Sequence, residues 1–144
     1  RQIRWIAPEN LHITLSFLGN VCIDNIPKLT KTLENSLSLV HLRISIEKTG
    51  VFPSLNFPKI LWMGVGRGKQ KIMVLHEQID AGVAPFKVGR KKYGFIPHIT
   101  IGRVARSSGK IDFLPFLEYV YSPIELNIKT MICIKTSLFN LAQI

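Results

Sequence analysis

A short motif occurs twice in this chain, and this repeat constrains the fold more than any other feature. Residues 12–15 read His-Ile-Thr-Leu, and residues 98–101 read His-Ile-Thr-Ile. Both copies lie where apolar and polar residues alternate, which is the pattern of a half-buried β-strand. Successive side chains of a strand point to opposite faces, so each copy presents its histidine and threonine on one face and its isoleucine on the other. We therefore expect two similar strands that bring two imidazoles and two hydroxyls to a common cleft.

The repeated polar residues, His12, Thr14, His98 and Thr100, are the candidate catalytic group. A pair of histidines suits phosphoryl chemistry in RNA, because a neutral imidazole can take a proton from water while an imidazolium gives one to the leaving ribose oxygen. Threonine hydroxyls can donate hydrogen bonds to the non-bridging phosphate oxygens. This division of labour requires no metal, and no cluster of His, Cys and Asp has the spacing of a metal site. The alternative is two unrelated strand histidines whose neighbours satisfy them.

The remaining histidines and the cysteines fit structural roles. The pattern predicts that His76 lies on the polar side of a helix and that His41 lies at a turn. Cys22 and Cys133 form no metal motif and no disulfide framework. Both lie among apolar residues, so we expect buried thiols in a reducing compartment, which places the protein in the cytoplasm.

Period-two and period-3.6 patterns together predict an α+β domain. The helices are expected over 24–40 and 69–81 with a short one over 111–117, and the strands over 11–17, 42–46, 60–65, 96–104 and 124–134. The order lacks the strict β-α-β rhythm of a doubly wound sheet, which favours α+β. A chain of 144 residues suits one domain, and no apolar run is long enough to cross a membrane.

The charge of the chain predicts a polyanionic partner. Lys and Arg number 19 against 9 Asp and Glu, a formal net charge of +10, and nucleic acid is the first candidate. Residues 82–110, which surround the second motif, contain no acidic residue. Arg90, Lys91 and Lys92 are expected to contact an RNA backbone there. Tyr93 and Phe95 could stack on a base, and the alternative for Phe95 is a place in the core.

Both motifs and their surroundings resemble a known family. Residues 12–19 read His-Ile-Thr-Leu-Ser-Phe-Leu-Gly, and residues 97–104 read Pro-His-Ile-Thr-Ile-Gly-Arg-Val. They resemble the two signature motifs of the 2H phosphoesterase superfamily, and within it the RNA 2′,3′-cyclic phosphodiesterases, also called 2′-5′ RNA ligases. The resemblance extends over residues 4–138 and includes 5–11, 52–54 and 61–62.

The resemblance implies a fold, an activity and a role for each motif residue. The fold would be bilobal, with a pseudo-two-fold arrangement of two antiparallel sheets flanking a cleft and helices on the outside. The activity would be hydrolysis of RNA 2′,3′-cyclic phosphate ends to 2′-phosphates, with 2′-5′ ligation as a weak reverse-type reaction. His12 would donate a proton to the leaving 3′ oxygen and His98 would activate water, while Thr14 and Thr100 would bind phosphate.

Arg103 occupies the place where the family carries a phosphate-contacting arginine. Its parity on the strand is opposite to that of His98, so the strand would have to end or bulge at Gly102 to bring it to the same face.

The full expectation is a single 2H phosphoesterase domain over residues 1–144 that lacks the family's N-terminal strand and helix. It would need no cofactor and would act as a monomer, away from membranes, on RNA with 2′,3′-cyclic phosphate ends such as tRNA fragments. Two alternatives stay open. One is a catalytically weak module that binds RNA ends. The other is a 2H phosphodiesterase for a different 2′-5′ or cyclic phosphate substrate.

Overall fold

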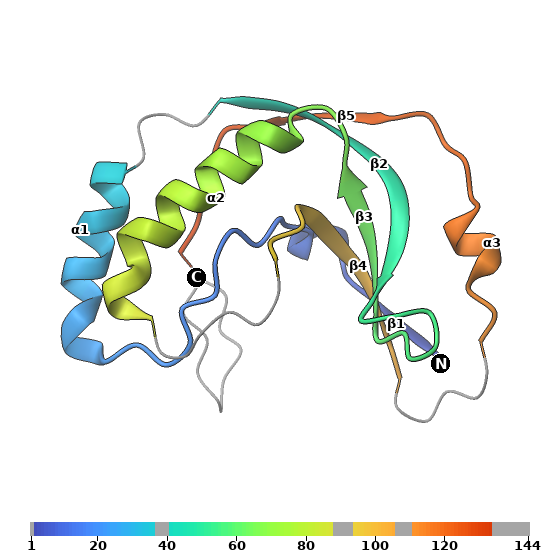
Figure 1. The fold of residues 1–144 in the computed structure, drawn as a ribbon, viewed down its shortest axis with the longest axis horizontal. Coiled ribbons are helices and arrows are strands. Elements are labelled where there is room, and N and C mark those ends of the chain that lie inside the picture. Colours follow the sequence, from blue (N-terminus) through green and yellow to red (C-terminus); the bar gives the residue numbers. More distant parts are fainter. Residues whose placement is uncertain (1, 37–40, 88–93, 106–110, 134–144) are drawn as a thin grey trace.

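A curved antiparallel sheet forms the centre of the computed structural model, which describes residues 2–36, 41–87, 94–105 and 111–133 (Figure 1). All five of its strands pair antiparallel, in the order β1-β4-β3-β2-β5. In chain order the strands are β1 (Ile3–Trp5), β2 (Leu42–Phe52), β3 (Ile60–Val65), β4 (His98–Val104) and β5 (Ile124–Ile128). The strand that carries the second motif, β4, therefore lies between β1 and β3.

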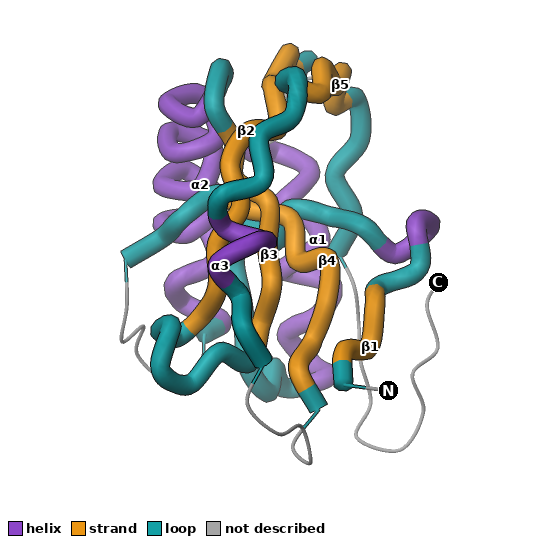
Figure 2. The backbone as a smooth tube through the Cα atoms, turned by 90° about the vertical axis from the view of Figure 1, so that its right-hand side faces the viewer, coloured by secondary structure: helices purple, strands orange, loops and turns teal. Residues whose placement is uncertain are grey.

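Two helices lie on one side of this sheet, behind the strands in Figure 2; the second packs directly on the sheet and the first packs against the second. They are α1 (Ile26–Ser36) and α2 (Lys69–Val83). A third, short helix, α3 (Leu114–Leu117), packs beside the second half of β2, where the hydroxyl of Thr49 donates a 2.8 Å hydrogen bond to the carbonyl of Phe116. Single 3-10 turns lie at Pro8–Asn10, Ile23–Asn25 and Ala84–Phe86. None of the helices in the described ranges is long and apolar enough to span a bilayer.

The core has two parts, one between the sheet and α2 and the other between α2 and α1. Ile44 and Ile46 of β2 are fully buried against Ile72 of α2, and a second cluster joins α1 to α2. Because strand side chains alternate, Arg43, Ser45 and Glu47 point to the other face of β2. That face carries no covering from α1 or α2, and it is where the repeated motifs present their polar side chains.

The α+β class is confirmed, and most of the expected elements are present: β3 has the expected bounds, β2 and α2 are longer than expected, and β4 and β5 are shorter. The expected strand over 124–134 ends at Ile128, and the expected helix over 24–40 is α1. The strand expected over 11–17 is the main local difference, because its only ladder contact with the described residues is a single bridge at Ile13. Two sheets were expected, whereas all the strands of the described residues belong to one.

The expectation of buried cysteines was wrong. Cys22 and Cys133 are both exposed. The apolar neighbours that suggested burial belong to the exposed edges of the molecule: Ile23 and Ile132, next to the two cysteines, are themselves 71% and 65% exposed. Apolar sequence context therefore did not indicate core packing at these two positions.

Candidate active site

The two copies of the motif lie side by side and antiparallel. Their only ladder contact is a bridge between Ile13 and Ile99, the middle residues of the two motifs. Antiparallel pairing about this bridge places His12 across from Thr100 and Thr14 across from His98. A local two-fold axis therefore relates the two His-Ile-Thr units.

This arrangement brings the two candidate histidines within reach of a single phosphate. His12 and His98 lie on the diagonal of the bridged pair, for which Cα atoms are about 7–8 Å apart. Ile13 and Ile99 pack against the core cluster, so the histidines and threonines face away from it. The structure thus brings together four of the residues that the sequence singled out.

Each histidine makes the same hydrogen bond to its own strand. Nδ1 of His12 lies 2.7 Å from the carbonyl of Asn10, and Nδ1 of His98 lies 2.6 Å from the carbonyl of Ile96. A carbonyl only accepts, so each Nδ1 carries the hydrogen. In the neutral imidazole the lone pair is then on Nε2, and in the charged form Nε2 is the available donor. Both rings are therefore oriented to exchange protons through Nε2.

Two aromatic side chains, Phe52 and Trp62, form a wall next to His98. The ring of Phe52 meets the imidazole edge-on at 5.0 Å between centroids, and the indole of Trp62 lies at 6.0 Å. Phe52 and Trp62 stack on each other at 5.1 Å. The indole lies flat because its neighbours are glycines: a methyl on Gly50 would overlap it, and one on Gly64 would come within 3.1 Å. These two glycines therefore allow the wall to form.

Two hydrogen bonds join helix α2 to the segment of the first motif. Nδ1 of His76 donates to the carbonyl of Leu15 at 2.7 Å, and the hydroxyl of Ser16 donates to Asp80 at 2.9 Å. The ring of His76 also stacks on Phe95 with 3.9 Å between centroids. His76 thus contacts the segments of both motifs from one position on α2.

The expectation that His76 lies on the polar side of this helix was wrong. His76 is 7% exposed. It lies at helical spacing from the buried residues Ile72, Ile79 and Val83, and this spacing was the signal that could have identified it. His76 therefore lies on the buried side of α2, whereas polar residues of this helix such as Glu77 are exposed.

A bulge in β4 decides where Arg103 points. Leu61 pairs with Gly102 while Trp62 pairs with Thr100, so Ile101 is an extra residue on β4. The bulge reverses the parity of the strand beyond it. Arg103 therefore pairs with Ile60, on the face that carries Trp62 and Thr100. This is the geometry that a phosphate-contacting role for Arg103 requires.

The same register reveals a residue that the sequence did not identify. Arg4 of β1 lies directly across from Arg103, and both side chains are exposed. Like charges placed opposite one another on neighbouring strands are unfavourable unless an anion lies between them. No local sequence pattern at Arg4 indicates that it lies across from Arg103, because this placement depends on which strand pairs with β1.

The other expected RNA contacts are only partly described. Arg90, Lys91, Lys92 and Tyr93 lie outside the described residues. Phe95 is half-buried, stacks on His76 and packs against the core cluster. Within the described ranges, no three His, Cys, Asp or Glu side chains come together as a group that could hold a metal ion.

Comparison with known proteins places the chain in a family. The family model described as the 2′-5′ RNA ligase superfamily matches residues 4–137. This chain belongs to the 2′-5′ RNA ligase superfamily. The resemblance seen in the two motifs is thereby confirmed at the level of the family.

Curated relatives in the superfamily carry one name. A protein of Aquifex aeolicus named RNA 2′,3′-cyclic phosphodiesterase is 32% identical over 107 residues, which cover 70% of this chain and 55% of the relative. One of the same name from Methanocaldococcus jannaschii is 32% identical over 102 residues, covering 71% and 56%. The chain thus spans just over half the length of these relatives.

Solved structures support the fold. The crystal structure of a Thermus thermophilus protein superposes with a TM-score of 0.64 at 22% identity, covering 90% of this chain and 68% of that one. Escherichia coli LigT, crystallised with 3′-AMP, superposes with a TM-score of 0.61 at 23% identity, covering 77% and 62%. These two solved proteins therefore share the overall fold of this chain.

Proposed function

We propose that this protein hydrolyses 2′,3′-cyclic phosphate ends of RNA to 2′-phosphate ends by acid/base catalysis between two histidines. The observation that carries the proposal is the bridge between Ile13 and Ile99, which sets two His-Ile-Thr units antiparallel with both Nε2 atoms available. The printed names of the curated relatives support the substrate class. The net charge of +10 supports an RNA partner.

The proposed reaction requires one proton to be removed from water and one proton to be given to the leaving 3′ oxygen. His98 Nε2 removes a proton from water as the oxygen attacks phosphorus. The bond from phosphorus to the 3′ oxygen breaks, and His12 Nε2 protonates that oxygen. The product is a 2′-phosphate and a free 3′ hydroxyl, and the pair is left with the proton exchanged between its members. A 2′-5′ ligation would run the same proton transfers with a ribose hydroxyl in the place of water.

The threonines and Arg103 would stabilise the negative charge that gathers on the non-bridging oxygens. The hydroxyls of Thr14 and Thr100 lie next to the opposite motif's histidine, so each could donate to a phosphate held between the imidazoles. Arg103, on the same face beyond the bulge, would add a charged donor.

The proposal extends to the whole protein and its setting. We assign residues 1–144 to a single 2H phosphoesterase domain of bilobal form, which would include the curved sheet. RNA ends such as tRNA fragments would enter past Arg90, Lys91, Lys92 and Tyr93. The protein would act as a monomer in the cytoplasm.

Two other functions fit some of the same observations. The +10 charge also fits a module that binds RNA ends without turnover. The paired histidines also fit a 2H phosphodiesterase for a different 2′-5′ or cyclic phosphate substrate.

The test is hydrolysis of a nucleoside 2′,3′-cyclic phosphate in the presence of a chelator, followed by phosphorus NMR. The parent protein is expected to yield the 2′-phosphate, and His12→Ala and His98→Ala are expected to lose turnover by at least about 100-fold each. His41→Ala, an exposed histidine outside the site, is the matched control and should retain the parent rate. A folded parent that binds the RNA end without turning it over would establish the binding module in place of the enzyme.

A further inference from the structure

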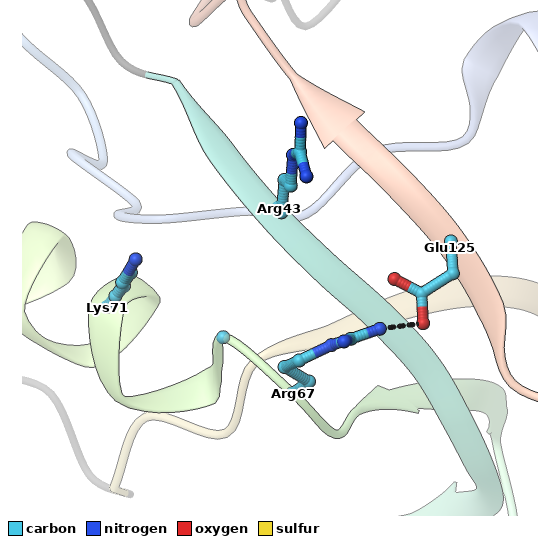
Figure 3. Close-up of a pocket in the computed structure, with 5 residues that line it drawn as sticks. Arg43, Arg67, Lys71 and Glu125 are labelled. Atoms are coloured by element: carbon cyan, nitrogen blue, oxygen red, sulfur yellow. Dashed lines mark hydrogen bonds and ion pairs between the residues drawn. The ribbon is translucent and has the colours of Figure 1, made fainter.

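A cationic cavity opens where β3 passes into α2, away from the two histidines. It has a volume of about 430 Å³ and is lined by Arg43, Arg67, Gly68, Lys71 and Glu125 (Figure 3). The lining side chains come from three strands or their ends and from the first turn of α2. Three cations and one carboxylate leave an excess of two positive charges in one concave space.

Two of these cations have no counter-charge of their own. The side chains of Arg43 and Lys71 make no hydrogen bond or ion pair within the described part of the chain, whereas Arg67 is paired with Glu125. Side chains of Arg67 and Glu125 are 68% and 55% exposed, and pairs this exposed contribute little to stability. The pair can therefore open at little cost, which would free a guanidinium for an incoming anion.

Arg43 places one side of the cavity on the same face of the sheet as the candidate active site, whereas Lys71 belongs to the first turn of α2, which follows β3. Glu47 of β2 lies across from Gly64 of β3, and Gly64 lies across from His98. Arg43 shares the parity of Glu47 and is four residues away along β2, a distance of about 13 Å. A strand of RNA whose end is held at the histidines would therefore reach the cavity within a few nucleotides.

Its chemistry matches a phosphodiester rather than a base. The lining offers guanidinium and ammonium donors and no aromatic ring, and arginine forks match phosphate oxygens in shape. Contacts of this kind fix the position of a nucleic-acid backbone without reading its sequence. We propose that Arg43, Arg67 and Lys71 form a subsite for a backbone phosphate upstream of the reacting RNA end. This inference rests on the proposed function, because it places the RNA end at the two histidines.

The experiment compares substrates of one to four nucleotides that all end in a 2′,3′-cyclic phosphate. In the parent, kcat/KM should rise once the substrate is long enough to reach the cavity. In Arg43→Ala and Lys71→Ala the ratio of kcat/KM for the tetranucleotide to that for the mononucleotide should fall roughly fourfold or more at 0.15 M salt. Glu125→Gln should raise this ratio, since it removes the competing carboxylate. Lys31→Ala, which removes an equal charge from α1 on the other face, is the control and should leave the ratio unchanged.

Binding measured by anisotropy with a tetranucleotide 2′-phosphate provides a readout independent of turnover. Each subsite variant should reduce the slope of log Kd against log salt by about 0.7. A ratio and a slope that do not change in Arg43→Ala and Lys71→Ala would overturn the subsite, as would equal losses for all four lengths. A parent that does not hydrolyse the mononucleotide would instead contradict the proposed function, and the anisotropy measurement would still decide the subsite.

Discussion

The buried imidazole of His76 donates a 2.7 Å hydrogen bond from Nδ1 to the carbonyl of Leu15, the residue that follows Thr14 of the first motif. The same ring stacks on Phe95, three residues before His98. A single side chain of α2 therefore contacts the two segments that carry the proposed catalytic histidines. Among the described residues the first motif has a single ladder bridge, so this contact helps to fix its position relative to β4.

Replacing His76 should therefore disturb catalysis without removing a reacting group. His76→Ala leaves the Leu15 carbonyl without its donor and opens space beneath the motif, which together should cost about 2–4 kcal/mol of stability. We expect kcat to fall at least about tenfold with a smaller change in KM, because the imidazole of His12 would be misplaced rather than lost. Circular dichroism melting and steady-state kinetics measure the two effects.

The conservative variant separates positioning from packing. The amide of His76→Asn can still donate to the Leu15 carbonyl, so it should recover much of kcat even where Tm stays low. Recovery of Tm without recovery of kcat would argue against the positioning role.

Gly50→Ala tests the aromatic wall beside His98. The added methyl would overlap the indole of Trp62, which must then lift from the sheet and lose its stacking on Phe52. We expect a loss of about 1–3 kcal/mol in stability and a lower kcat. Gly94→Ala is the matched control, because a methyl there meets no atom within 4 Å. Indole fluorescence that is the same in the parent and in Gly50→Ala would contradict this account.

The sequence identified the residues of the candidate site, but it did not show how the fold brings them together. Alternation within residues 12–15 and 98–101 is local, so it revealed which side chains share a face. What alternation cannot reveal is the partner of a segment. Within the described part of the chain, the first motif pairs with β4 at one residue and is also held by α2, through tertiary contacts of His76 and Asp80.

The position of Arg103 shows the same limit. Simple parity places it on the face opposite to His98, and a single extra residue at Ile101 reverses that result. A bulge depends on the neighbouring strands. The sequence therefore showed that a bulge was needed to bring Arg103 to the face of His98, but it could not show that the strand has one. Arg4 was missed for the same reason, since its place across from Arg103 follows from the order of strands in the sheet.

Arg4→Glu should separate stability from activity. Opposite charges across a strand pair are favourable, so a carboxylate facing Arg103 should raise Tm by about 1–3 °C. The same carboxylate would neutralise Arg103 and repel phosphate, so kcat/KM should fall at least about tenfold. Arg4→Gln, which removes the repulsion without adding a negative charge, should lose much less activity. An active Arg4→Glu protein would show that neither arginine meets the substrate.

Tyr121 provides a test of the described contacts at alkaline pH. Burial raises the pKa of its phenol above the usual 10.0, and the negative charge of Glu47 raises it further. The neutral phenol donates a 3.0 Å hydrogen bond to the carbonyl of Lys48. The unfolded chain loses its proton first, so the stability that Tyr121 provides is fully present below pH 10 and is lost as pH rises through the folded pKa. Tyr121→Phe should therefore lower Tm by about 2–4 °C at pH 8. The difference in Tm between the parent and Tyr121→Phe should become smaller above about pH 10. A difference in Tm that stays constant up to about pH 11.5 would contradict the burial of this phenol.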